Sequence, residues 1–287
     1  MGAVIVVWGC NWPIMKIALR EIEPLTFAFA RLAMGAICLF ALLAATGRLR
    51  LPGRADMPVV LSVALLQLAA FMALINLGLA RVDAGRSVIL CYTTLIWVTP
   101  IAAIFLDERL TKAKAAGLAL GLGGIVTLFN PFGFDWRNEA ALAGNAMLLG
   151  AAFLWAITIV HIKTHRFALT PLQLAPWQMI IGTLPVAVLA FVWEDPLALW
   201  PSANLWLTLA YNGPLATAFT LWAWTTVTRA LPAITTAMAS LAVPVVGALS
   251  SMVVLNEAIG TTNIVGFALI LAGLAAISAE TATRAKG

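Results

Sequence analysis

The run VVWGCNWPIMKIAL, residues 6–19, carries polar and aromatic side chains inside an otherwise apolar segment. Four of them are three or four residues apart, namely Trp8, Asn11, Trp12 and Met15. On a helix they share one broad face. An indole ring can stack on a flat side chain or on a cation, and an amide supplies both donors and an acceptor. This face is therefore able to bind a small molecule in a cavity.

The same stretch also permits a purely structural interpretation. Pro13 lacks a backbone N–H and frees a carbonyl near residue 9, which inside a membrane must be satisfied by a neighbour or by water. Gly9 allows a second helix to approach closely, and Asn11 can hydrogen-bond to that helix. The sequence favours neither interpretation of Asn11 over the other.

Later in the chain, Trp155 is followed three residues on by Thr158, which repeats this pattern. Other aromatic side chains in the central apolar segments offer further stacking faces. The predicted substrate-binding residues are Trp8, Asn11, Trp12, Met15, Tyr92, Trp97, Trp155, Thr158 and Tyr211.

Basic side chains form a second set of candidates, for gating or charge. Lys16 and Lys163 lie near the ends of apolar segments, where a lysine either extends to the lipid headgroups or holds a carboxylate as an anchor or gate latch. Arg31 joins this set because it lies about 10 Å inside its segment, which is deep enough to need a partner or water. His161 and His165 are the residues able to titrate near neutral pH, and His161 joins this set.

The twelve acidic residues all fall in loops or at the ends of apolar segments. A proton-coupled exporter of cationic drugs commonly holds a carboxylate at the midplane, as proton carrier and partner of the cation. The sequence therefore argues against a transporter of cationic drugs and against carboxylate-based proton coupling. The acidic residues are Glu21, Glu23, Asp56, Asp83, Asp107, Glu108, Asp135, Glu139, Glu194, Asp195, Glu257 and Glu280.

The sequence offers few residues for catalysis, metal binding or nucleic-acid binding. A membrane-embedded enzyme needs a nucleophile, an acid–base pair or a metal set, and two histidines on one helix without a buried Asp do not supply one. Cys10, Cys38 and Cys91 are odd in number and lie inside apolar segments, so we expect them to pack rather than to bind metal or form a disulfide. No basic cluster interleaved with aromatics suggests nucleic acid. We expect no enzyme activity, no cofactor, no metal and no nucleic-acid partner.

Membrane-spanning helices must position these residues. The 287 residues are 62% hydrophobic and 10% charged, which a soluble domain cannot carry on its surface. A span needs about 20 mainly apolar residues, so the chain has room for roughly ten. The predicted spans cover residues 2–19, 24–46, 57–79, 84–106, 113–129, 141–162, 171–193, 203–226, 233–255 and 261–279. We expect an all-α integral membrane protein whose partners are the lipid bilayer and a small-molecule substrate.

The chain is also predicted to be a duplication. Sliding it along itself by 147 residues aligns Trp8 with Trp155, Lys16 with Lys163, Pro24 with Pro171 and Gly35 with Gly182. Five spans separate each pair, so the halves, residues 1–139 and 140–287, are expected to be inverted around a central cavity. Inverted repeats are the architecture of alternating-access transporters, which bind substrate near the midplane. The helix breakers predicted as hinges are Gly85, Pro100, Pro232 and Pro244.

The distribution of Lys and Arg predicts the orientation. With the N-terminus in the cytoplasm, more of these residues fall in cytoplasmic segments than at the outer ends. This bias favours a cytoplasmic location for both termini.

Four segments resemble the two repeated units of the EamA type in the drug/metabolite transporter superfamily. They are VVWGCNWPIMK, EPLTFAFARLAMGA, DERLTKAKAAGLALGLGGIV and LNEAIGTTNIVGFALILAGLAAI. Within that family the sequence is most similar to bacterial inner-membrane exporters of aromatic amino acids. The resemblance implies a ten-helix monomer that exports aromatic and other neutral amino acids through a cavity open alternately to either side. Because no acidic residue lies inside a predicted span, we expect this export to be facilitated and driven by the substrate gradient. The alternatives are export of other small metabolites or drugs, and, from a different class, a membrane-embedded enzyme.

The family pattern has a basic residue like Arg31, and the resemblance implies a structural or gating contact there rather than direct substrate binding. The two halves of this sequence depart from each other, since WAITIVHIK in the second replaces WGCNWPIMK in the first. The second half has Gln178 where the first has Arg31. We therefore expect the two faces of the cavity to differ chemically.

Overall fold

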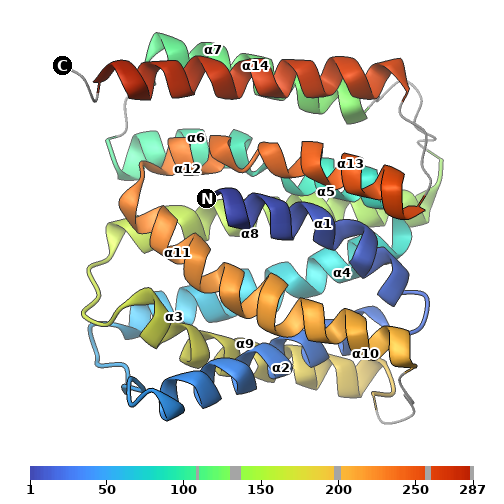
Figure 1. Cartoon of the computed structure of the whole chain (residues 1–287), viewed down its shortest axis with the longest axis vertical. Helices are drawn as coiled ribbons and strands as arrows, with labels where there is room; N and C mark the ends of the chain where they lie inside the picture. Colours follow the sequence, from blue (N-terminus) through green and yellow to red (C-terminus); the bar gives the residue numbers. More distant parts are fainter. Residues whose placement is uncertain (108–109, 130–136, 197–201, 256–259, 285–287) are drawn as a thin grey trace.

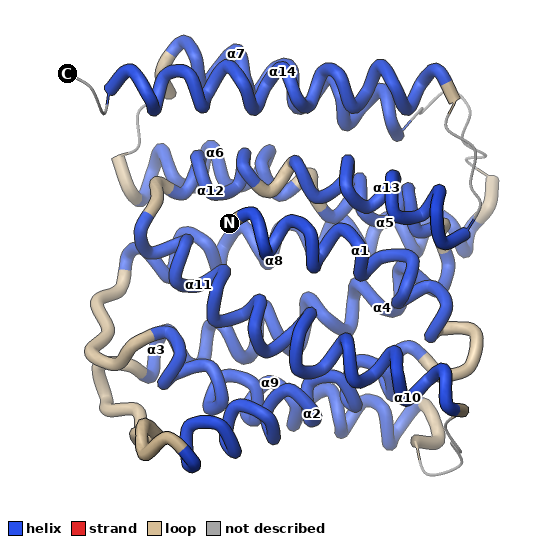
Figure 2. The backbone as a smooth tube through the Cα atoms, viewed as in Figure 1, coloured by secondary structure: helices blue, strands red, loops and turns tan. Residues whose placement is uncertain are grey.

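The computed structural model describes residues 1–107, 110–129, 137–196, 202–255 and 260–284. Within these ranges the chain is helical with connecting loops and has no strand, which confirms the all-α prediction (Figure 2). In chain order the first helices are α1 (Gly2–Ala18), α2 (Pro24–Ala45), α3 (Met57–Ser62), the π-helix η1 (Val63–Ala70), α4 (Phe71–Arg81), α5 (Ala84–Cys91), α6 (Thr94–Phe105) and α7 (Lys112–Phe129). They are followed by α8 (Glu139–Thr164), α9 (Pro171–Trp193), α10 (Ala203–Ala210), the π-helix η3 (Tyr211–Phe219), α11 (Thr220–Ala230), α12 (Ala233–Ala239), α13 (Ala242–Leu255) and α14 (Thr261–Arg284).

Six helical runs in the described residues are long and apolar enough to cross a membrane. They are Pro24–Ala45, Met57–Arg81, Ala84–Phe105, Glu139–Thr164, Pro171–Trp193 and Ala233–Ser251. Gly2–Ala18 and Ile264–Ala276 are shorter apolar helices. Large apolar side chains such as Leu184, Val192 and Leu207 are exposed on the outside, which suits contact with hydrocarbon rather than with water.

Helix starts follow local sequence signals. α2 and α9 both begin with proline, whose fixed φ and missing N–H suit the first helical turn. Thr170 precedes α9 and forms a capping box with Gln173. At α2 the carboxylate of Glu194, from the end of α9, accepts hydrogen bonds from the backbone N–H groups of Leu25 (3.0 Å) and Thr26 (2.7 Å). An acidic residue thus ties two neighbouring helices together at their ends.

A second carboxylate holds a loop in place. Asp56 precedes α3 and is only 2% exposed. Its oxygens accept from the backbone N–H groups of Gly53 (2.9 Å), Ala168 (2.7 Å) and Leu169 (3.2 Å). Burial opposes ionisation of this carboxyl, but the three N–H donors outweigh burial and lower its pKa.

The acidic residues within the described ranges lie in loops or near helix ends, in keeping with their sequence pattern. Glu108, Asp135 and Glu257 lie outside the described residues.

Two of the predicted spans contain π-helical stretches, η1 and η3. A π-helix shifts the backbone ladder by one residue and re-aims the side chains that follow it. In η3 the cause is visible, because Pro214 has no N–H to give to the ladder. η1 carries Gln67 and η3 carries Thr217, both of which matter for the cavity described below.

Two other predicted spans are each divided into two helices, but the interruptions do not fall at the prolines that were predicted as hinges. The breaks fall between α5 and α6 and between α12 and α13. At these breaks the hydroxyls of Thr93 and Ser240 donate to the carbonyls of Leu90 and Ala237, both at 2.6 Å. Such local bonds compete with the helical ladder.

The predicted hinge residues lie elsewhere. Pro232 directly precedes α12, Pro244 is the third residue of α13, and Gly85 is in the first turn of α5. At a helix start proline costs no intrahelical hydrogen bond, so no break follows. Pro100 lies inside α6. Whether the four residues act as hinges concerns motion and stays a prediction.

The helices pack in layers (Figure 1). α7 packs along α14 at one end of the molecule, and α2 packs along α9 at the other. Between them α1 packs on α13, while α8 packs on α4 and α6. Glycines allow the α7–α14 contact, since a Cβ on Gly124 would lie 2.6 Å from Gly266 O. Central helices α1 and α8 thus have neighbours on several sides, and these enclose the candidate site.

Candidate functional site

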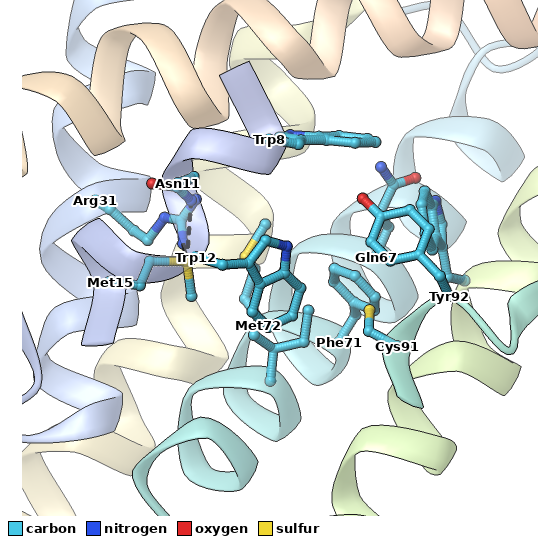
Figure 3. A pocket seen from close by; sticks show the side chains of 12 residues that line it. Trp8, Asn11, Trp12, Met15, Arg31, Gln67, Phe71, Met72, Cys91 and Tyr92 are labelled. Carbon is cyan, nitrogen blue, oxygen red and sulfur yellow. Dashed lines mark hydrogen bonds between the residues drawn. The ribbon is translucent and has the colours of Figure 1, made fainter. Parts of the chain in front are cut away.

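A cavity of about 50 Å³ lies between α1, α2, η1, α4, α5 and α8 (Figure 3). Six of the nine predicted substrate-binding residues line it: Trp8, Asn11, Trp12, Met15, Tyr92 and Trp155. It is also lined by Arg31, Gln67, Phe71, Met72, Ile75 and Cys91. Most of its wall is therefore aromatic or aliphatic, with a few polar groups.

The proline in α1 is accommodated by a neighbouring helix. The Gly9 carbonyl, which Pro13 leaves without its helical donor, accepts a hydrogen bond of 3.2 Å from Ser250 Oγ of α13. A Cβ on Gly9 would lie 2.5 Å from Val246 Cγ1, so only glycine allows this approach. The predicted structural roles of Pro13 and Gly9 are thus both present, and they hold α1 firmly against α13.

Asn11 is one of the residues that line the cavity. It is 4% exposed, and its Nδ2 donates to Met15 Sδ at 2.9 Å, one turn along the same helix. Its Oδ1 has no hydrogen-bond partner in the described part of the chain. The structure records no bond from Asn11 to another helix within those residues. Of the two interpretations the geometry favours cavity lining.

Arg31 is buried, at 2% exposure, and lines the same cavity. Its Nε donates to Thr217 Oγ1 of η3 at 2.9 Å, and its Nη1 lies 3.3 Å from Met15 Sδ. The bond to Thr217 joins α2 to η3, and a structural or gating role for it stays a prediction. The guanidinium also faces the cavity, which the sequence did not predict.

An aromatic cluster forms one side of the cavity. The ring centroids of Trp8 and Trp155 are 5.5 Å apart at 77°, and Trp224 lies 5.2 Å from the first and 5.0 Å from the second. Tyr92 meets Trp155 edge-on at 5.5 Å. The indole N–H of Trp8 donates to Thr220 Oγ1 at 3.0 Å, so its ring is locked. Fixed rings of this kind present both edges and faces to a flat ligand.

Three predicted residues lie outside the cavity. Trp97 is 37% exposed on the outer surface. Thr158 is fully buried and donates to Leu154 O of its own helix at 3.0 Å. Tyr211 donates from its hydroxyl to Val7 O of α1 at 2.8 Å. Their side chains are used in packing and hydrogen bonding between or within helices.

Five cavity residues were missed by sequence reasoning: Gln67, Phe71, Met72, Ile75 and Cys91. A signal existed for Gln67, since it is an amide in the middle of the apolar run VALLQLAA. It is 4% exposed, and its Oε1 has no partner within the described residues. The others are apolar or weakly polar side chains whose orientation depends on neighbouring helices.

Lys16 binds the end of a helix. Its Nζ donates to Leu79 O (2.8 Å) and Val82 O (2.9 Å) at the C-terminus of α4. The last carbonyls of a helix lack intrahelical donors and carry partial negative charge, which a lysine stabilises. The ammonium thus binds backbone carbonyls in place of the expected headgroup or carboxylate.

Lys163 makes a similar contact. Its Nζ donates to Thr228 O (3.2 Å) and Leu231 O (2.6 Å) at the C-terminus of α11. A gating role for either lysine stays a prediction.

His161 does not line the cavity and lies near the end of α8. Its Nδ1 is 2.8 Å from Ser62 Oγ, and its ring stacks on that of His165 with centroids 4.0 Å apart. These contacts join α8 to α3 and give no direct link to the cavity.

Comparisons with known proteins agree on one family. The sequence pattern described as "EamA-like transporter family" matches residues 1–130 and again residues 142–279. The chain is 30% identical to the uncharacterized transporter YoaV of Bacillus subtilis, over 95% of this chain and 93% of that protein. It is 27% identical to a probable amino-acid metabolite efflux pump of Escherichia coli, over 94% and 91%. It is also 27% identical to a probable terminal-alkyne amino-acid exporter of Streptantibioticus cattleyicolor, over 98% and 92%.

A solved crystal structure has a similar fold. It superposes with a TM-score of 0.75 at 20% identity and covers 100% of this chain and 99% of its own. At this identity the likeness concerns the fold alone.

Proposed function

Because this chain belongs to the EamA-like transporter family, we propose that it exports neutral amino acids, aromatic ones among them, across the bacterial inner membrane by alternating access. The family and the relatives' names support a multi-pass membrane transporter of small molecules and point away from an enzyme. The amino-acid substrate, the inner membrane and the mechanism are our proposal.

The proposed architecture is a monomer of ten spans in two inverted halves, residues 1–139 and 140–287, with both termini cytoplasmic. Equivalent features at nearly constant spacing support it. Thr93 and Ser240, which mark the two helix breaks, are 147 residues apart, as are Lys16 and Lys163. The π-helices η1 and η3 begin 148 residues apart, at Val63 and Tyr211.

One observation carries the substrate proposal: the cavity combines fixed aromatic rings with a few unsatisfied polar groups, deep among the helices. Trp8, Trp155 and Tyr92 supply the rings, and Asn11 and Gln67 each have an acceptor oxygen without a donor in the described residues. An aromatic amino acid needs both a stacking surface and polar groups for its ends.

The size of the cavity fits a closed stage of alternating access. Ligand pockets commonly have volumes of about 300–1,000 Å³, whereas this cavity measures about 50 Å³ and holds little more than water. Substrate must then enter through a movement of helices that widens it. The breaks at residues 92–93 and 240–241 and the π-helices are places where such a movement needs few new hydrogen bonds.

Flux into proteoliposomes tests the proposal. The purified protein is reconstituted and supplied with radiolabelled phenylalanine, tryptophan, threonine and methyl viologen, with and without a pH gradient, and Asn11→Ala serves as the site variant. We expect saturable amino-acid flux that ignores the pH gradient and is reduced in the variant. Flux of methyl viologen alone, or flux that needs protons, would contradict the proposal. Flux of other metabolites with none of the amino acids would favour the alternative of a different metabolite exporter.

A further inference from the structure

The charge of Arg31 is unusual for its surroundings. A buried charge is costly unless it is paired, and buried arginines normally meet a carboxylate or a phosphate. In the described part of the chain the structure records no acidic side chain within 4.0 Å of this guanidinium. A guanidinium has five N–H donors, of which the bonds to Thr217 and to the weak acceptor Met15 Sδ use two. Arg31 Cζ also lies 5.8 Å from the centroid of the Phe27 ring, a contact that uses no N–H group. The remaining N–H donors have no hydrogen-bond partner among the described residues.

Asn11 stands directly beside this charge. Both Asn11 Nδ2 and Arg31 Nη1 donate to the same atom, Met15 Sδ, at 2.9 and 3.3 Å. Figure 3 shows the two side chains together at one end of the cavity. The Asn11 Oδ1 atom has no donor within the described residues. Surplus N–H groups and an unused acceptor therefore lie side by side.

The rest of the cavity has a different character. In Figure 3, Gln67 and Tyr92 lie across the cavity from Arg31, beneath Trp8. Trp12, Phe71 and Met72 also line the space. A ligand with a polar, doubly charged head and an apolar tail can thus place its head at the Arg31 end and its tail among the rings.

We propose that Arg31 and Asn11 form the head-group subsite of this transporter, with Arg31 binding the α-carboxylate and Asn11 Oδ1 accepting from the α-ammonium of an amino acid. The inference rests on the proposed function, because it concerns the same cavity and names how the substrate is held. It replaces the expectation that Arg31 serves only as a structural or gating contact. Selection for a carboxylate follows, since an uncharged amide cannot compensate the buried charge.

Ligand binding to the purified full-length protein tests this subsite, with calorimetry as the readout. The ligands are phenylalanine, phenylalaninamide, which lacks the carboxylate, and 3-phenylpropanoate, which lacks the ammonium. For the wild type we expect phenylalanine to bind about tenfold or more tightly than its amide. In Arg31→Gln the affinity for phenylalanine should fall to that for the amide, while the amide is little affected. In Asn11→Ala, the affinity for phenylalanine should fall toward the affinity for 3-phenylpropanoate. The affinity for 3-phenylpropanoate itself should stay unchanged.

Thr217→Val is the matched control, because it removes the bond from Arg31 to η3 and keeps the charge. It should retain the preference for phenylalanine over its amide. If Arg31→Gln weakens both ligands equally, or if Thr217→Val reproduces its effect, Arg31 only joins α2 to η3 and the inference is overturned. Should Arg31→Gln fail to fold, Arg31→Lys keeps the charge but loses the planar fork. Arg31→Lys should then lower the affinity for phenylalanine several-fold and leave the affinity for the amide unchanged. An equal loss of affinity for both ligands would overturn the inference.

The flux assay separates this inference from the proposed function. A wild type that moves no amino acid ends the proposed function, and the subsite with it. The subsite alone is overturned if the wild type transports phenylalanine and the Arg31→Gln variant still discriminates against the amide.

Discussion

Lys16 and Lys163 hold two helix ends in the same way: each Nζ atom donates to two carbonyl oxygens, at the C-terminus of α4 for Lys16 and of α11 for Lys163. A hydrogen bond from a charged group contributes about 1.5–3 kcal/mol, and the helix dipole adds to it. We expect Lys16→Met and Lys163→Met to lower the free energy of unfolding by about 1–3 kcal/mol each, measured by denaturant unfolding in detergent. Lys112→Met is the control, because Lys112 is exposed at the start of α7. Variants that keep full stability but lose flux would instead identify the lysines as gate residues.

The contact of α1 with α13 depends on Gly9. A Cβ there would lie 2.5 Å from Val246 Cγ1 and 3.1 Å from Gly247 N, so the two helices must separate. We expect Gly9→Ala to destabilise the protein by about 1–3 kcal/mol and to lower its thermal midpoint. Gly123→Ala is a matched control in α7, where a Cβ meets nothing within 4 Å and the change should be neutral or slightly stabilising. Equal midpoints for the two variants would refute this account of the contact.

Asp56 should make stability depend on pH. Its pKa is lowered in the folded state, because three backbone N–H donors outweigh the opposing effect of burial. Its contribution is therefore fully present above the unfolded-state pKa of about 4 and is lost as the pH falls through the lower folded-state value. We expect Asp56→Asn to be less stable than the wild type at pH 7 by about 1–3 kcal/mol, with the gap closing below about pH 4. Asp195→Asn, at an exposed position without this set of N–H donors, is the control and should leave stability at pH 7 nearly unchanged.

A comparison of Trp155, which lines the cavity, with Trp97, which lies on the outer surface, tests the role of the cavity rings. Trp155 is 2% exposed at the centre of the aromatic cluster, whereas Trp97 packs on Phe153 with centroids 5.3 Å apart and is 37% exposed. We expect Trp155→Phe to raise the KM for tryptophan flux about fivefold, since an aromatic ring contact contributes roughly 1 kcal/mol. Trp97→Phe should leave KM unchanged. A similar loss in both variants would show that the effect is on folding and not on the cavity.

Thiol labelling tests whether water reaches the cavity. In a background in which Cys10, Cys38 and Cys91 are replaced by alanine, we expect Asn11→Cys to react with a water-soluble thiol reagent and to be protected by phenylalanine. Thr158→Cys should not react, because Thr158 is fully buried outside the cavity. An unreactive Asn11→Cys would indicate that α1 serves only in packing.

The sequence by itself determined the helices and part of the site. Its apolar content and the spacing of polar breaks predicted the helical ranges within a few residues, because the bilayer demands long apolar runs with every backbone group satisfied internally. The helical period was enough to place Trp8, Asn11, Trp12 and Met15 on one face of a helix, since a face within a single helix is a local property. The structure shows that this face lines the cavity.

Only the tertiary structure decided which faces meet. It added Gln67 and Phe71 to the cavity and left Trp97 outside it. It turned Arg31 toward Asn11, although they lie on different helices and touch through Met15 Sδ. The physical reason is that a helix face is assigned to a cavity, a neighbour or lipid by contacts between residues far apart in sequence. Residue spacing within one helix does not encode those contacts.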